Sequence, residues 1–269
     1  MDDRPTTRAL REASRACRAR ASVLLGLASA LERGDETRLA RALERIRTNP
    51  EPCVDPEVAE AQAWLANRRA TRRERFAVEL RAACEREGVE LVLLGRDPLE
   101  LRLPPVSVGV DLEAGRAEVR FAGLEVRRTQ AEADAVLTAR AEAVAWLEGR
   151  DWDPAAWLAV LKRAWLRASH GQETWVELTD VLPEVALLRQ RRRFRRDPTA
   201  RNFEPYPAVR FAYDLWRARR DGVLSTDGWR LSLGPATGGS TRDRSRVLLL
   251  EDARGQGQYH LTLRFVREA

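Results

Sequence analysis

Lysine is almost absent from this sequence. Lys162 is the only lysine among 47 basic residues, and the chain of 269 residues has two histidines. A GxxxxGK[ST] phosphate-binding loop is therefore excluded, and so is the Asp/Glu-x-Lys end of a nuclease motif, because the residues before Lys162 are aliphatic. Three widely spaced cysteines form no CxxC pair, which predicts reduced thiols and no structural zinc site: Cys17, Cys53 and Cys84.

A long apolar run is missing too. The only continuous apolar run near the N-terminus is Ala21–Leu31, which is shorter than the roughly 20 residues that cross a bilayer. Arginines precede this run as they do in signal peptides, but Asp2, Asp3 and Glu12 lie among them. We therefore expect an ordinary buried helix here, and a cytoplasmic protein without membrane contact.

The positive charge is concentrated in one part of the chain. Hydrophobic residues make up 44 % and charged residues 33 % of the sequence, enough for a core beneath a charged surface. Residues 189–220 hold eleven arginines and three acids, a local charge of +8, whereas the net charge of the whole chain is +6. The other 237 residues therefore sum to −2, and this asymmetry indicates a polyanion as the partner.

The first part of the chain, residues 1–150, predicts an α+β module in which helices flank a small antiparallel sheet. Leucines at helical spacing indicate two helices over residues 5–49, and an Asp-Pro start indicates a long helix over 55–87. Period-2 alternation between residues 89 and 128 predicts three or four strands. Thr129 and Glu132 have the spacing of a capping box that opens a helix ending near residue 148.

The second part, residues 151–269, predicts a winged-helix-like basic module. Asp153-Pro154 opens a helix, and a short apolar segment, two further helices and three strand-like runs follow. This order of helix, short strand, helix, helix and β-hairpin is that of a winged helix-turn-helix. The polar hairpin tip with Arg242, Arg244 and Arg246 would then be the wing.

The arginines of the second module are the candidate binding residues, and we expect nucleic acid, DNA rather than RNA, as their ligand. Closely spaced guanidinium groups repel one another unless anions pair with them, and their planar fork matches phosphate oxygens. A contact with an acidic protein, or a merely solvated basic face, is the alternative. The candidates are Arg189, Arg191, Arg192, Arg193, Arg195, Arg196, Arg201, Arg210, Arg217, Arg242 and Arg244.

Two of these arginines lie on a predicted helix over residues 207–220. As a recognition helix it would place Arg210 and Arg217 at phosphates or guanine edges. Asp214 is four residues after Arg210 and three before Arg217, so a local salt-bridge ladder is the alternative. We therefore expect backbone binding with weak sequence preference.

Four aromatic residues are interleaved with the arginines: Phe194, Phe203, Tyr206 and Phe211. Aromatic side chains in a basic groove can stack on unpaired bases. Such residues also form cores, and this is the alternative interpretation.

No catalytic, cofactor-binding or metal-binding residue is assigned, and we expect a protein that is not an enzyme. The minor alternative rests on Asp111, which ends a strand before a glycine turn. This pattern is similar to the metal-binding first hairpin of RNase H-like nucleases, and it implies Mg²⁺ ligands at Glu113, Glu125 and Asp134.

The long charged helix over residues 55–87 predicts contact with a protein partner or with a second copy. A non-catalytic DNA-binding protein of this layout suits an accessory subunit of a DNA-processing, defence or mobile-element assembly, or a regulator. The competing hypothesis is a protein–protein adaptor whose arginines bind an acidic surface.

Overall fold

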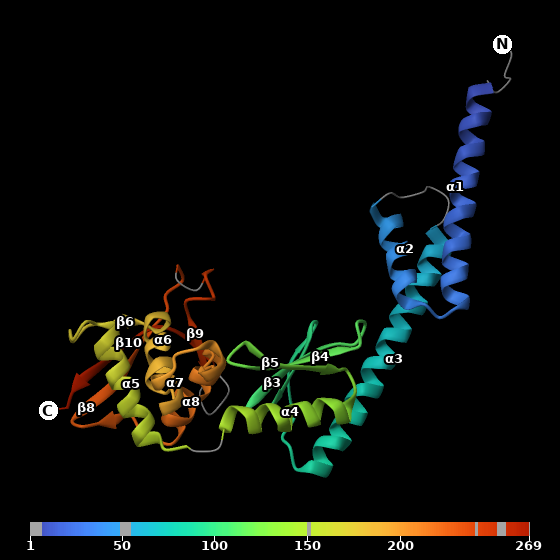
Figure 1. Cartoon of the computed structure of the whole chain (residues 1–269). Helices are drawn as coiled ribbons and strands as arrows, with labels where there is room; N and C mark the ends of the chain where they lie inside the picture. The colour runs from blue at the N-terminus through green and yellow to red at the C-terminus, as the bar shows by residue number, and fades with distance from the viewer. Residues whose placement is uncertain (1–6, 49–54, 150–151, 240–241, 252–256, 269) are drawn as a thin grey trace. The chain divides into compact units, whose positions relative to one another are not determined.

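The computed structural model of the chain describes residues 7–48, 55–149, 152–239, 242–251 and 257–268 (Figure 1). Within these ranges the protein is a mixture of helices and antiparallel sheets, as the sequence predicts.

The chain divides into two compact units. The first unit comprises residues 1–81 and 112–114, and the second comprises residues 82–111 and 115–269. Residue 150, the module boundary expected from the sequence, lies inside the second unit, because the small sheet groups with the C-terminal elements and not with the first helices.

The first unit is built from helices, as predicted: α1 (Thr7–Glu32), α2 (Glu36–Thr48) and the first part of α3 (Asp55–Glu87). Gly34 connects α1 to α2 with a φ of +63°, a conformation that glycine adopts without strain. The core is a cluster of alanine and leucine side chains at helical spacing: Leu27, Ala30, Leu39, Leu43, Ala61 and Leu65. Arg72 of α3 pairs with Glu36 of α2 at 2.7 Å and adds a polar tie.

The second unit begins with a five-stranded antiparallel meander. Its strands are β1 (Val92–Arg96), β2 (Leu99–Leu103), β3 (Val106–Asp111), β4 (Arg116–Phe121) and β5 (Leu124–Gln130). Because side chains alternate along a strand, Leu103, Val108 and Val119 share one buried face. Helix α4 (Ala133–Glu148) packs on this sheet at β4 and β5.

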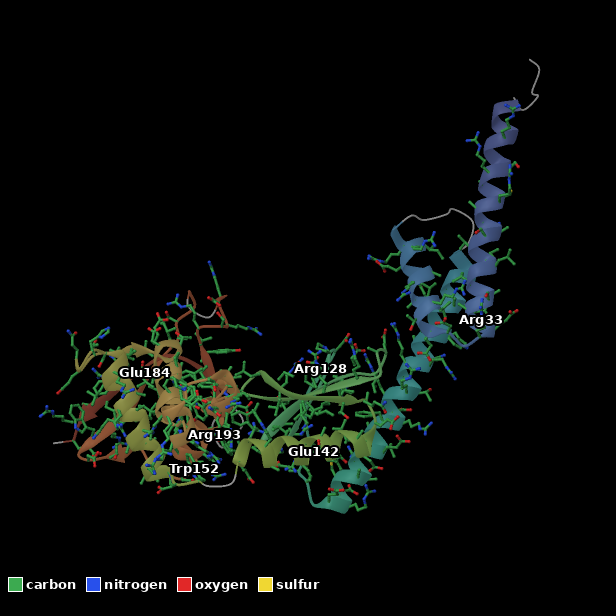
Figure 2. All side chains as sticks on the ribbon, in the orientation of Figure 1. Arg33, Arg128, Glu142, Trp152, Glu184 and Arg193 are labelled. Atoms are coloured by element: carbon green, nitrogen blue, oxygen red, sulfur yellow. The ribbon has the colours of Figure 1, made fainter. Side chains whose placement is uncertain are left out.

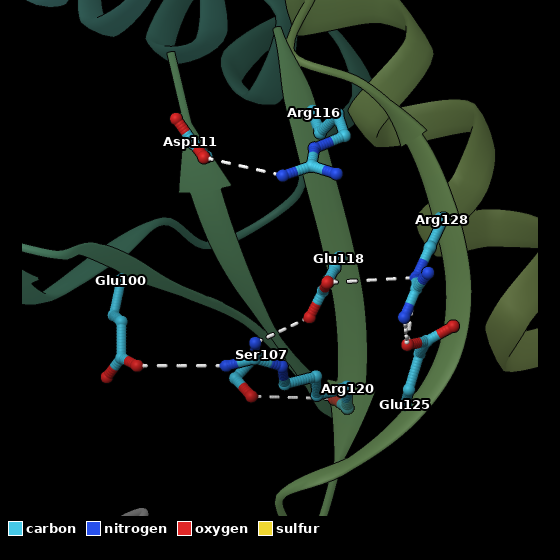
Figure 3. Close-up of polar contacts among 8 residues, drawn as sticks. All are labelled: Glu100, Ser107, Asp111, Arg116, Glu118, Arg120, Glu125 and Arg128. Carbon is cyan, nitrogen blue, oxygen red and sulfur yellow. Dashed lines mark hydrogen bonds and ion pairs between the residues drawn. The ribbon is translucent and has the colours of Figure 1, made fainter. Parts of the chain in front are cut away.

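The opposite face of the meander carries a network of alternating charges (Figure 3). Glu100 and Glu118 contact Arg120 at 3.8 and 2.5 Å, and Arg128 contacts Glu118 and Glu125 at 3.7 and 2.6 Å. Cross-strand pairs of opposite charge stabilise a sheet. The arginines of this face therefore have carboxylate partners within the fold.

Two local predictions in this region were wrong. Alternation over residues 117–126 predicts a single strand, but this segment forms two strands, because Ala122 and Gly123 both have positive φ and form a two-residue hairpin turn. The predicted capping box does not form either, because Thr129 lies in β5 and Glu132, the cap residue, makes no side-chain cap bond.

The second unit continues with further helices and a second sheet. The helices are α5 (Pro154–Ala168), α6 (Leu178–Leu188), the short α7 (Arg192–Arg196), a 3-10 turn (Ala200–Asn202) and α8 (Ala208–Arg220). Asp153 caps α5 as predicted, since its carboxylate accepts a hydrogen bond from the Ala156 amide at 3.0 Å. Thr179 and Asp180 are residue types that predict the start of α6 at their positions, but that helix already begins at Leu178, after the cap residue Glu177.

The second sheet has the strand order β6-β10-β8-β7, and β9 also pairs with β10. Its strands are β6 (Val176–Glu177), β7 (Ser225–Thr226), β8 (Trp229–Pro235), β9 (Leu248–Glu251) and β10 (Gly257–Arg267). Trp165 of α5 packs against Phe265 of β10 with ring centroids 5.5 Å apart. Through this contact α5 packs on the second sheet, and the two rings form part of the hydrophobic core between them.

His260 of β10 makes the stability of the second unit sensitive to acid. The side chain is 5 % exposed, and burial, with Arg219 nearby, lowers the pKa of His260 to about 4. An unfolded histidine has a pKa of about 6.5, so between these values the unfolded chain binds a proton that the folded chain does not. We expect the free energy of unfolding to fall by up to about 3 kcal/mol between pH 6.5 and 4 from this group alone.

Urea titrations of the wild type and of His260→Gln, at half-unit steps of pH, measure this effect. The variant should lose less stability than the wild type over that interval. Parallel pH profiles for the two proteins would contradict the assignment.

Candidate nucleic-acid interface

Seven arginines lie between α6 and α8 in what we call the arginine stretch, residues 189–201. All seven are exposed: Arg189, Arg191, Arg192, Arg193, Arg195, Arg196 and Arg201. Four of them belong to α7, whose five residues are RRFRR. Exposed guanidinium groups are therefore concentrated in one segment, as the sequence predicts. Arg193, one of the four in α7, is labelled in Figure 2.

Two buried amide side chains hold this segment in place. The Gln190 amide donates to the carbonyls of Ala186 and Glu204 at 2.8 and 2.9 Å, and its oxygen accepts from the Glu204 backbone amide at 2.9 Å. Asn202 donates to the Asp197 carbonyl and to the Thr199 hydroxyl at 2.9 and 3.0 Å. Sequence reasoning missed both residues, because their partners can be identified only once the chain has folded back.

Four of the arginines have partners inside the segment or next to it. Arg191 pairs with Glu204 at 2.6 Å and Arg201 with Asp197 at 3.8 Å. Arg195 donates to the Leu188 carbonyl at 3.1 Å. Arg189 lies over the Tyr206 ring, 4.8 Å from its centroid. These contacts fix the edges of the arginine stretch and neutralise part of its charge.

Arg192, Arg193 and Arg196 form the unneutralised part, which we call the open triad. Within the described ranges, no carboxylate lies within ion-pair distance of any of the three. Like charges this close raise the local positive potential, because each guanidinium sits in the field of the others. The phosphates of a nucleic-acid backbone neutralise positive charge of this kind.

The proposed recognition helix does not present its arginines as expected. Arg217 of α8 is 5 % exposed and pairs with Asp214 at 2.5 Å, so it cannot reach a phosphate or a base edge. Arg210 is half-buried and lies over the Trp146 ring, 5.6 Å from its centroid. The ladder interpretation is therefore correct for the Asp214–Arg217 pair, and Arg217 is removed from the interface.

Asp214 is the centre of a buried polar network. Its carboxylate accepts from the Tyr206 hydroxyl at 2.6 Å, and that hydroxyl accepts from the Trp157 indole at 3.0 Å. Arg217 also donates to the Glu148 carbonyl at 3.0 Å. Burial, together with the charge of Asp214, raises the pKa of Tyr206 well above its usual value, so the phenol stays a hydrogen-bond donor.

Arg242 and Arg244 precede β9 in the second sheet. Both are exposed, and Arg246, which follows them, pairs with Glu177 of β6. Arg242 and Arg244 are thus exposed cations that belong to a different segment of the chain from the arginine stretch.

The aromatic residues of the region divide into two kinds. Tyr206 and Phe211 are buried, with 8 % and 1 % exposure, and belong to the core. Phe194 and Phe203 are half-buried and pack edge-to-face, with ring centroids 5.5 Å apart. Stacking on unpaired bases is thus left to the second pair alone.

The carboxylates of the nuclease alternative are occupied by arginines. Asp111 contacts Arg116 at 3.8 Å, and Glu125 and Asp134 contact Arg128 and Arg86 at 2.6 and 2.8 Å. Glu113 belongs to the first unit and contacts Arg69 at 2.7 Å. Nowhere in the described part of the chain do three acidic, histidine or cysteine side chains gather as metal ligands would.

The sequence matches no known family model, no curated protein and no solved structure. Of the helices in the described ranges, none is both long enough and apolar enough to cross a membrane.

Removal of the Asp214 carboxylate should destabilise the second unit strongly. Asp214→Ala leaves the Arg217 guanidinium buried without its counter-charge, and breaking one side of a buried pair costs about 3–5 kcal/mol. Glu173→Ala removes an exposed carboxylate 3.0 Å from Arg267 and should cost less than about 1 kcal/mol. Chemical denaturation of both variants measures the difference, and equal losses would show that Asp214 is not a centre of stability.

Proposed function

We propose that this protein is a non-catalytic nucleic-acid-binding protein that holds the phosphate backbone of DNA with its arginine stretch. The observation that carries the proposal is the open triad: Arg192, Arg193 and Arg196 are exposed, adjacent and without a carboxylate partner among the described residues. Elsewhere in the second unit, arginines such as Arg120 and Arg128 are paired with glutamates.

The frame around the triad supports the proposal. Gln190 and Asn202 are buried and hydrogen-bonded on either side of α7, so the three guanidinium groups extend from a segment that is already ordered. Ordering that is complete before binding costs no free energy on association. Phosphate contacts of this kind position a duplex without reading its sequence, and we therefore expect weak sequence preference.

We also propose that residues 154–267 form a variant of the winged helix-turn-helix. The support is that α5, α6 and α8 precede the strands β8 and β10, and that the short strand β6 pairs with β10. Helix α8, in the recognition position, is largely buried. Binding in this variant would therefore use the arginine stretch and, at the wing, Arg242 and Arg244. Such a protein suits an accessory subunit of a larger DNA-handling assembly.

Replacement of the open triad should weaken DNA binding and its dependence on salt. For Arg192→Gln/Arg193→Gln/Arg196→Gln we expect at least a tenfold loss of affinity for a 20-base-pair duplex at 0.1 M salt. The slope of log K against log salt should become less steep by about 2 to 3, because each lost phosphate contact removes about 0.9. Fluorescence anisotropy at four salt concentrations measures both.

The matched control removes the same charge elsewhere, with Arg81→Gln/Arg163→Gln/Arg230→Gln, three arginines that are also exposed. This control should keep its affinity within about threefold, because its phosphate contacts are intact. A wild-type protein that binds acidic peptides but no DNA would replace the proposal with the adaptor hypothesis. Equal losses of DNA affinity in the two triple variants would show that the arginine stretch acts only through the net charge of the protein and is not a binding site.

A further inference from the structure

Among the described residues, the first half of α1 has no packing partner. Residues 14–18 are exposed at every position, so the helix is open around its whole circumference there, whereas Leu27 and Ala30 further along are buried. In Figure 1 this half extends past the ends of α2 and α3, the other helices of the first unit. A lone helical segment of about this length is only marginally stable in water. The described side chains of this segment therefore do not contribute to the hydrophobic core of the first unit.

Three arginines lie on one face of this free half. Arg11, Arg15 and Arg18 are spaced by four and three residues, which places them on one stripe of the helix. All three are exposed, and no carboxylate of the described residues is paired with them; Arg18 bonds only Ser14 of its own helix. Residues 11–22 contain four arginines and one glutamate, a net charge of +3. Like charges at this spacing destabilise an isolated helix.

The dimensions and composition of this segment fit the major groove of B-form DNA. The groove is about 12 Å wide and admits an α-helix, which is about 10–12 Å across with its side chains. Apart from Glu12, the residues between the three arginines are Ala, Ser and Cys, so bulky side chains do not hold the helix away from the groove. The stripe covers about 10 Å of the helix axis, which corresponds to about three base pairs.

We infer that the first half of α1 is a second DNA-binding element, which lies in the major groove and contacts phosphates through Arg11, Arg15 and Arg18. The inference extends the proposed function, and it uses a different element in the other compact unit. Two basic elements on one chain raise the overall affinity, because the second contact forms within the complex that the first has made.

The test compares the wild-type chain with Arg11→Gln/Arg15→Gln/Arg18→Gln on two duplexes of equal length, one of DNA and one of RNA. On DNA the variant should lose about tenfold or more in affinity, and its salt slope should fall by about 2 to 3. On RNA the loss should be less than threefold, because the major groove of A-form RNA is too deep and narrow to be read. The Arg81/Arg163/Arg230 variant is the charge-matched control.

The results separate this inference from the proposed function. An α1 variant that binds DNA like the wild type, beside an open-triad variant that does not, overturns the inference and leaves the proposed function intact. The opposite pair of results supports α1 and overturns the role of the arginine stretch. An equal loss on DNA and RNA would overturn the groove placement. If the α1 variant binds DNA like the wild type but no longer binds vesicles of phosphatidylserine and phosphatidylcholine that the wild type binds, the three arginines of α1 contact a membrane surface instead.

Discussion

The carboxylate of Asp214 is the constraint on which the arrangement of the second unit depends. It is completely buried, and a charge so far from water is tolerated only when it is paired and hydrogen-bonded. Tyr206 and Arg217 supply these bonds, and Arg217 in turn reaches the carbonyl of Glu148 at the end of α4 and stacks on Trp152 at 3.5 Å. The contacts of this one carboxylate and of Arg217 therefore position α8, the segment before it and the end of α4.

This network also determines which arginines stay available outside. Because α8 buries Asp214 and Arg217, neither side chain is available to a ligand, and the exposed arginines of the region are those of the arginine stretch together with Arg219 and Arg220 at the end of α8. The connection is physical, since Tyr206 bonds Asp214 on one side and lies under Arg189 on the other. The core and the surface of this region are thus positioned by the same few side chains.

Sequence patterns predicted what depends on neighbours along the chain and missed what depends on distant partners. The predicted helices and the Asp153 cap follow from local spacing and are present, and so are the alternating strands, except that the last of them is divided in two and the sheet has five strands in place of three or four. The burial of Arg217 could not be read from its spacing to Asp214, because it also needs Glu148 and Trp152 from more than sixty positions away. The hairpin at Ala122 and Gly123 was missed for a different reason: alanine seldom has a positive φ, so only the glycine marked a turn.

Because nearly every basic residue of this chain is an arginine, the number of arginines in a segment says little about its function. Whether each arginine has a carboxylate partner within the fold says much more. On the outer face of the meander, each described arginine–glutamate contact satisfies a cation within the fold, and nothing external is required. The open triad and the stripe on α1 differ in that the described fold supplies them with no counter-charge. Clustered cations of this kind raise the free energy of the unbound protein through mutual repulsion. An anion that relieves this repulsion binds with that free energy in its favour, and a polyphosphate, with charges repeated at short intervals, relieves more of it than any single ion.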